Sequence, residues 1–187
     1  MTTTYLLHGG RVSLQLPSNK AFIHEILTHT PHTPHILRVP FAGHKEHLSL
    51  PHTQRKMATH AAGKPFTVSH ATPDEQVFLE EIKRADVIYI NGGDPKELLP
   101  WIVFLAQHLH LLDGKLVVGV SAGANCLATA AYSNTYQQVL PGSGVLPIIT
   151  ICHYTDEFVD AVAEMQAAHP TYRLVALEDG QREKIVM

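Results

Sequence analysis

The sequence of 187 residues has little of the features that mark several whole classes of protein. It holds only two cysteines, Cys126 and Cys152, which are too few for a disulfide framework and are typical of a reducing compartment. Its formal net charge is −3, so composition gives no reason to expect nucleic acid or an anionic membrane as a partner.

Membrane and export signals are also missing from the sequence. No apolar run approaches the roughly 18 residues that a membrane-spanning helix needs. The first ten residues (Met-Thr-Thr-Thr-Tyr-Leu-Leu-His-Gly-Gly) contain no basic segment followed by an apolar one, as a secretory signal would. We therefore expect a cytoplasmic protein.

Histidine is frequent, with 14 copies, but its spacing does not indicate a metal site. In the segment 29–35 histidine recurs every three residues, and the two prolines between them prevent a helix that would align the rings. His44 and His47 also lack a rigid motif of the His-Glu-x-x-His kind. We expect a solvated polar loop here, and neither a metal nor a cofactor.

Strand-like and helix-like patterns alternate along the chain, which predicts a three-layer α/β/α fold with a mostly parallel central sheet. The expected strands are 3–7, 36–39, 66–68, 87–90, 116–120, 148–152, 174–176 and 184–187. The expected helices are 19–28, one within 44–64, 72–84, 94–111 and 156–168. The length, without a repeat or linker, predicts a single domain over residues 1–187.

Two of these helices have clear start signals. Residues 72–75 (Thr-Pro-Asp-Glu) place a threonine before a proline, with glutamate three residues after the threonine. Residues 94–97 (Asp-Pro-Lys-Glu) repeat the arrangement. An N-cap residue, proline at the first helical position and an acidic third residue form a capping box, so we expect Thr72 and Asp94 to be the N-caps.

The segment 119–123 (Gly-Val-Ser-Ala-Gly) lies between the apolar strand 116–120 and a helix, which is typical of a nucleophile elbow. Ser121 would occupy a strained turn, and glycine two residues away on each side removes a collision with neighbouring backbone. The following helix N-terminus would stabilise an oxyanion. The pattern alone also fits a glycine-rich turn without chemistry.

A second glycine loop, Asn-Gly-Gly-Asp at 91–94, follows the strand 87–90. Open α/β sheets bind ligands at the carboxyl ends of their strands, where both loops are expected. The backbone N–H groups of Gly93 and Ala122 could form an oxyanion hole, although a plain turn and helix cap would look the same. The neighbouring residues expected to contact a substrate are Gly92, Asp94 and Asn125.

A serine nucleophile needs a base and a carboxylate that orients the base. His153 follows the strand 148–152, again at a carboxyl end. Glu178 and Asp179 follow the strand 174–176, and either carboxylate could reach His153. Candidate groups therefore gather at four strand ends.

In this order the motifs resemble the peptidase E family, which includes aspartyl dipeptidases and related cyanophycinases. The resemblance rests on residues 91–94, on Gly-Val-Ser-Ala-Gly-Ala-Asn at 119–125, on His-Tyr-Thr at 153–155 and on Leu-Glu-Asp-Gly at 177–180. It implies a class I glutamine-amidotransferase-like fold and a serine peptidase that acts on a short peptide or other small amide. It makes Ser121 the nucleophile, His153 the base and Asp179 the acid, because the family's acid precedes a glycine.

Other functions stay open at this level. An α/β-hydrolase would place its acid before its histidine, and a glutamine amidotransferase would have cysteine at position 121. The segment 154–172 has no arginine or lysine, so the family's preference for aspartyl substrates is not expected to carry over. A non-catalytic binding module of the same fold and an esterase-like hydrolase are the alternatives, and the oligomeric state is not predicted.

Overall fold

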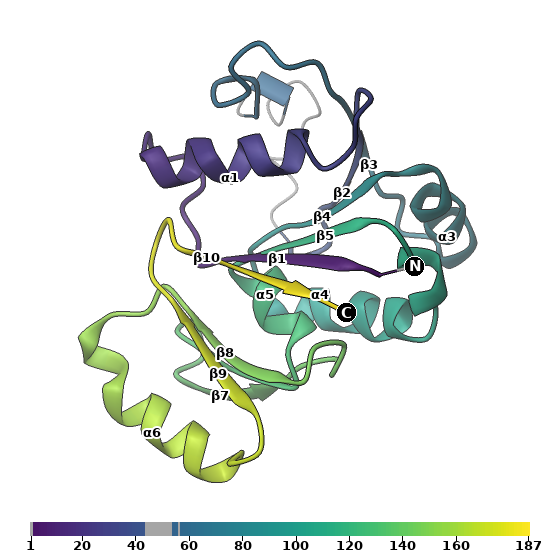
Figure 1. The fold of residues 1–187 in the computed structure, drawn as a ribbon. Helices are drawn as coiled ribbons and strands as arrows, with labels where there is room; N and C mark the ends of the chain where they lie inside the picture. The colour runs from purple at the N-terminus through teal and green to yellow at the C-terminus, as the bar shows by residue number, and fades with distance from the viewer. Residues whose placement is uncertain (1, 44–53, 56) are drawn as a thin grey trace.

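The computed structural model describes residues 2–43, 54–55 and 57–187, which form two β-sheets with helices packed against them (Figure 1). The larger sheet consists of β1 (Thr4–His8), β2 (His35–Val39), β3 (Thr67–His70), β4 (Val87–Ile90), β5 (Leu116–Val120) and β10 (Arg182–Val186). The smaller sheet consists of β6 (Ala130–Ser133), β7 (Gln138–Pro141), β8 (Ile148–Cys152) and β9 (Arg173–Leu177).

Both sheets are mostly parallel and have one antiparallel strand at an edge. The strand orders are β10-β1-β5-β4-β2-β3 and β7-β6-β8-β9. β10 runs antiparallel to β1, and β7 runs antiparallel to β6, whereas the remaining pairs are parallel. The predicted α/β fold with a mostly parallel sheet is confirmed, but the sheet is divided into two.

The helices cover the larger sheet on both faces and join it to the smaller one. They are α1 (Pro17–Leu27), α3 (Glu75–Arg84), α4 (Pro95–Ala106), α5 (Ala122–Leu127) and α6 (Val159–Ala168). In Figure 1, α1 lies on one face of the larger sheet and α4 and α5 lie on the other, with the smaller sheet and α6 beyond α5.

Each helix buries the apolar face that its sequence pattern supplies. Phe22 and Ile26 of α1 pack with Leu6 in one fully buried cluster, since an α-helix brings residues four apart to the same face. Met165 of α6 packs on Ile149 of the smaller sheet in a separate cluster. The largest cluster holds residues from α3, α4 and α5 together with both sheets.

The strands with continuous apolar runs were predicted well, and a short hairpin was missed. β4, β5 and β8 have the predicted bounds. The strand β6 has the sequence Ala-Ala-Tyr-Ser, in which the two alanines have low strand propensity, so its pattern gives little signal. It forms because it pairs with β7 on one side and with β8 on the other.

One of the two predicted helix caps is wrong. Asp74, and not Thr72, is the N-cap of α3, where its carboxylate accepts the Val77 N–H at 3.0 Å. The N–H and hydroxyl groups of Thr72 donate instead to the carboxylate of Glu81, which lies further along the same helix. A carboxylate directly before the helix accepts backbone N–H groups better than a hydroxyl two residues away, and its charge favours the helix dipole.

The second predicted cap is confirmed at Asp94, whose carboxylate accepts the Lys96 N–H at 2.8 Å. The helix it starts, α4, ends at Ala106 and is followed by a 3₁₀ turn at Leu109–Leu112, so it is shorter than predicted. Of the helix expected within 44–64, residues 44–53 and 56 lie outside the described residues, and residues 54–55 and 57–58 are helical. Within the part of the chain that is described, no helix is long and apolar enough to cross a membrane.

The packing of α4 predicts a contrast between two of its residues. Leu98 is fully buried, whereas Val103 is 42% exposed on the same helix. We expect Leu98→Ala to lower the free energy of unfolding by about 2–5 kcal/mol and Val103→Ala to lower it by less than about 0.5 kcal/mol. Urea unfolding of both variants measures this, and equal losses would contradict the assignment of α4 to the core.

Candidate active site

Ser121 lies on a sharp turn between β5 and α5. Its backbone has φ 51° and ψ −114°, a conformation that non-glycine residues rarely adopt and that costs on the order of 1–3 kcal/mol. The turn is held by hydrogen bonds on both sides: the Ser121 N–H donates to the His8 carbonyl at 2.9 Å, and the Asn125 N–H donates to the Ser121 carbonyl at 3.0 Å. The strained turn is therefore held by one bond to β1 and one bond within the start of α5.

The glycines around Ser121 are required by close backbone contacts. A Cβ atom on Gly119 would lie 2.9 Å from the Ala124 backbone, and one on Gly123 would lie 2.4 Å from the Ile90 carbonyl oxygen. A Cβ atom on Gly92 would lie 3.2 Å from the Cβ atom of Ser121. The 91–94 loop thus lies directly beside the serine.

Two short hydrogen bonds join Ser121, His153 and Asp179. Ser121 Oγ lies 2.8 Å from His153 Nε2, and His153 Nδ1 lies 2.6 Å from Asp179 Oδ1. A neutral imidazole that donates through Nδ1 to the carboxylate presents Nε2 as the acceptor for the serine hydroxyl. The neighbouring Glu178 is exposed and its backbone N–H contacts Gln181, so Asp179 is the carboxylate that reaches His153.

The segment 8–11, which no sequence motif assigned to the site, contacts Ser121, His153 and Asp179. The His8 carbonyl accepts the Ser121 N–H, and the Gly9 carbonyl accepts the His153 N–H at 3.1 Å. His153 has a positive φ of 54°, and this backbone bond helps to hold it. The available sequence signal was the pair of glycines directly after a buried strand.

The next two residues of the segment contact the base and the acid. Gly10 lies against the His153 ring, since a Cβ atom there would be 2.0 Å from Cε1. The Gly10 carbonyl accepts the Gly180 N–H at 3.3 Å. Arg11 Nε lies 3.0 Å from the second carboxylate oxygen of Asp179, Oδ2.

The predicted oxyanion donors, Gly93 and Ala122, lie on the two loops that meet at Ser121. Gly93 has φ +141°, and a Cβ atom there would be 2.3 Å from the Ala42 carbonyl oxygen, so only glycine fits. Ala122 is the first residue of α5, at the end where helix N–H groups have no partner within the helix. Their joint action on an oxyanion stays a prediction.

Asp94 and Asn125, expected to contact a substrate, also have structural partners. Asp94 Oδ2 accepts the Tyr136 hydroxyl at 2.8 Å, and this bond raises the pKa of the Tyr136 phenol. Asn125 Oδ1 accepts the Thr150 hydroxyl at 3.0 Å, which ties α5 to the smaller sheet. Substrate contact by either residue stays a prediction.

The turn between β6 and β7 bridges the loops on either side of the serine. Asn134 Nδ2 donates to the His153 carbonyl at 3.4 Å, while Tyr136 bonds to Asp94. The Lys96 ammonium lies 3.7 Å above the centre of the Tyr136 ring, a cation–π contact. The hairpin that sequence patterns missed therefore links the base loop to the second glycine loop.

Neither cysteine competes with Ser121 as a nucleophile. Burial raises the pKa of the Cys126 thiol and that of the Cys152 thiol to about 12. The thiolate is the reactive form, so both side chains stay unreactive near neutral pH. Across the described residues, no group of three histidine, cysteine or acidic side chains could hold a metal ion.

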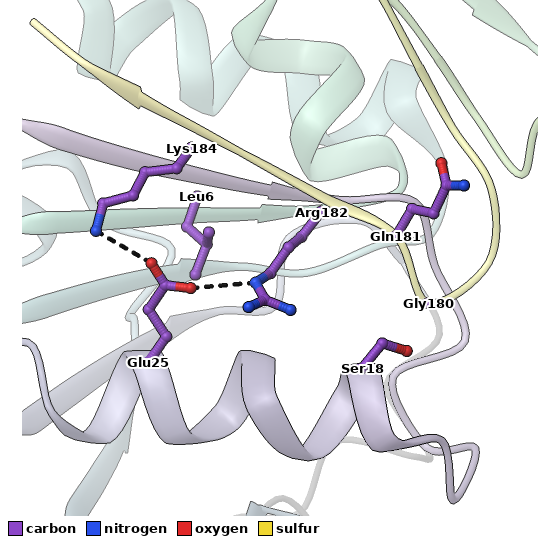
Figure 2. A pocket seen from close by; sticks show the side chains of 7 residues that line it. All are labelled: Leu6, Ser18, Glu25, Gly180, Gln181, Arg182 and Lys184. Atoms are coloured by element: carbon purple, nitrogen blue, oxygen red, sulfur yellow. Dashed lines mark hydrogen bonds and ion pairs between the residues drawn. The ribbon is translucent and has the colours of Figure 1, made fainter.

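A separate hollow of about 490 Å³ lies between α1 and β10, beside Gly180 (Figure 2). Its carboxylate, Glu25, is paired with Arg182 Nε and with Lys184 Nζ, each at 3.1 Å. These ion pairs attach α1 to β10, so the residues around the hollow stabilise the packing of the helix on this strand.

Solved structures share this fold. A peptidase from an acI-B1 Actinobacterium aligns with a TM-score of 0.66 at 20% identity, over 99% of this chain and 84% of that one. A putative peptidase E from Listeria monocytogenes EGD-e aligns with a TM-score of 0.66 at 16% identity, over 100% of this chain and 98% of that one. The architecture is that of peptidase E proteins, as the motifs predicted.

A match over nearly the whole sequence identifies the family. The family model for peptidase family S51 matches residues 6–185. The chain belongs to peptidase family S51. No match was found among curated proteins.

The contact between Gly10 and the His153 ring generates a test of the geometry. We expect Gly10→Ala to push the ring away from Ser121, and to slow the reaction of Ser121 with a fluorophosphonate about a hundredfold or more, because an ångström of misplacement has effects of this size. A crystal structure of the variant and its labelling rate measure this.

Gly144→Ala is the matched control. Gly144 also has a positive φ, of 72°, but a Cβ atom there would meet nothing within 4 Å. Alanine is less strained at φ 72° than at the φ of 136° of Gly10, so this variant introduces a side chain at positive φ without a collision, and we expect an unchanged labelling rate. Equal effects in both variants would show that the contact of Gly10 with the His153 ring is not the cause.

Proposed function

We propose that this protein is a serine peptidase that cleaves a short peptide or another small amide through Ser121, His153 and Asp179. The observation that supports it most directly is the unbroken chain of hydrogen bonds, 2.8 Å and 2.6 Å, that starts from a serine on a strained turn. Membership of peptidase family S51 supports the reaction class.

In the proposed mechanism, His153 Nε2 accepts the hydroxyl proton while Ser121 Oγ attacks the scissile carbonyl carbon. The imidazolium then donates this proton to the leaving amine, and the acyl-enzyme that remains is hydrolysed by water. Asp179 holds the imidazole in the tautomer that leaves Nε2 as the acceptor. The N–H groups of Gly93 and Ala122 donate to the oxyanion, and the reaction requires no cofactor.

The first test uses a fluorophosphonate probe, which reacts with activated serines. We expect the probe to label Ser121, and Ser121→Ala or His153→Ala to abolish labelling, because the first change removes the nucleophile and the second removes the base. Asp179→Asn should lower peptidase activity by up to about four orders of magnitude, as the corresponding change does in serine proteases with a Ser-His-Asp triad.

Glu178→Gln is the matched control, because Glu178 is the adjacent, exposed carboxylate. It should retain nearly full activity. A larger loss of activity in Glu178→Gln than in Asp179→Asn would show that Glu178, and not Asp179, is the acid. A folded wild type that the probe does not label would favour a non-catalytic binding module of the same fold.

The proposal includes a substrate preference, argued from charges around the site. An acidic substrate side chain is normally bound by a fixed cation. Of the basic residues that could supply this cation, Arg11 is paired with Asp179, Lys96 lies over Tyr136, and Lys45 lies outside the described residues. The segment 154–172 after His153 supplies acidic residues such as Glu157 and neither arginine nor lysine, so it offers no cation for a substrate carboxylate.

We therefore expect no preference for N-terminal aspartate. In a panel of Xaa-Leu dipeptides, kcat/KM for Asp-Leu should stay within tenfold of that for the near-isosteric Asn-Leu. A tenfold or greater preference for Asp-Leu, about 1.4 kcal/mol of transition-state binding, would contradict this and would require a cation at the substrate site.

A further inference from the structure

The carboxylate of Asp179 is held through both of its oxygens. Oδ1 lies 2.6 Å from His153 Nδ1, and Oδ2 lies 3.0 Å from Arg11 Nε. A carboxylate held by one oxygen can rotate about its terminal bond, whereas a second bond fixes its plane. The orientation of Asp179 toward the imidazole therefore depends on Arg11.

The backbone that carries Arg11 is fixed by a buried side chain. Asn19 is fully buried at the start of α1, and its Nδ2 donates to the carbonyls of Arg11 at 3.0 Å and Leu14 at 2.8 Å. Although the Arg11 side chain is 67% exposed, its main chain has a defined position. An exposed guanidinium on an anchored backbone loses less entropy on pairing than one on a mobile loop.

His8 completes this support from the larger sheet. Its Nδ1 accepts the Gly10 N–H at 3.1 Å, so the ring proton lies on Nε2, which donates to Asn19 Oδ1 at 2.9 Å. Burial lowers the pKa of the His8 imidazole, which favours the neutral ring that this pattern needs.

The same helix supports the other side of the ion pair. A Cβ atom on Gly180, next to Asp179, would lie 2.9 Å from Leu16 and 3.0 Å from Ser18 at the start of α1. Figure 2 shows Gly180 and Ser18 facing each other across this contact. The N-terminal end of α1 thus positions both Arg11 and Asp179.

We propose that Arg11 is a positioning residue, which fixes the Asp179 carboxylate so that it orients His153 toward Ser121. This inference rests on the proposed function. Arginine suits the task because its Nε–H points in a fixed direction within a planar group, whereas a lysine ammonium rotates.

Arg11 also affects the charge felt by the imidazole. Among the described residues, Asp179 bonds to the His153 ring, Arg11 pairs with that carboxylate, and the buried His8 and Cys152 lie nearby. Burial favours the neutral His8 ring and the protonated Cys152 thiol, so Asp179 and Arg11 carry the charges of this cluster. Removing the guanidinium leaves the carboxylate unopposed and favours the protonated imidazole.

The experiment follows the His153 ring by NMR across a pH titration in wild type, Arg11→Gln and Arg11→Lys. We expect Arg11→Gln to move the titration midpoint upward, because the change removes a positive charge that pairs with the Asp179 carboxylate. Arg11→Lys should keep the midpoint near wild type, because it keeps the charge. Both variants should react with the fluorophosphonate at least severalfold more slowly, because neither reproduces the Nε bond.

Arg173→Gln is the matched control. Arg173 pairs with Glu183 at 2.6 Å, and its exposure resembles that of the Arg11 pair, but it lies at the start of β9. It should change neither the midpoint nor the labelling rate. An effect as large as that of Arg11→Gln would show that the signal is nonspecific and would overturn the proposal.

The outcomes separate this inference from the proposed function. An unchanged midpoint in a folded Arg11→Gln overturns the role of Arg11, whether or not the protein is active, because the titration needs no turnover. A wild type that is not labelled rejects the peptidase mechanism. An Arg11→Lys variant as fast as wild type would reject the geometric role and leave a charge effect alone.

Discussion

The arrangement of the site depends on the parallel pairing of β1 with β5. In this register His8 lies opposite Val120, so the segment that follows β1 runs beside the serine turn that follows β5. Successive carbonyls of that segment then reach Ser121 and His153. Parallel strands end at the same edge, and here the register decides which backbone groups meet there.

The site combines strained backbone with dense hydrogen bonding. Ser121 and His153 both have positive φ values without being glycine, and each such residue costs on the order of 1–3 kcal/mol. Their N–H groups donate to the carbonyls of His8 and Gly9, so residues at the end of β1 hold both strained conformations. A stable sheet edge is thus a condition for an oriented serine and histidine.

Sequence patterns predicted the elements whose cause is local. β4, β5 and β8 are apolar runs long enough to be buried, and Asp94 is a helix cap with proline after it. The same patterns placed Ser121, His153 and Asp179 at strand ends, and the structure brings these three side chains together. The roles of these residues in catalysis remain part of the proposal.

The elements that were missed have tertiary causes. The alanines of β6 form a strand because β8 lies beside them, and no local propensity reports this. The contact of Arg11 with Asp179 joins residues near opposite ends of the sequence, so no spacing rule could find it. Thr72 has a capping pattern, but Asp74 is closer to the helix and competes better for its N–H groups.

The pairing of β1 with β10 has a consequence for folding kinetics. Contacts between residues far apart in sequence form slowly, because the entropy cost of closing a long loop comes before the stabilising contacts form. His8 pairs with Arg182 across this ladder, which places Arg11 just beyond one strand and Asp179 just before the other. During refolding, the acid and its arginine therefore meet only when this ladder closes and joins residues near opposite ends of the sequence.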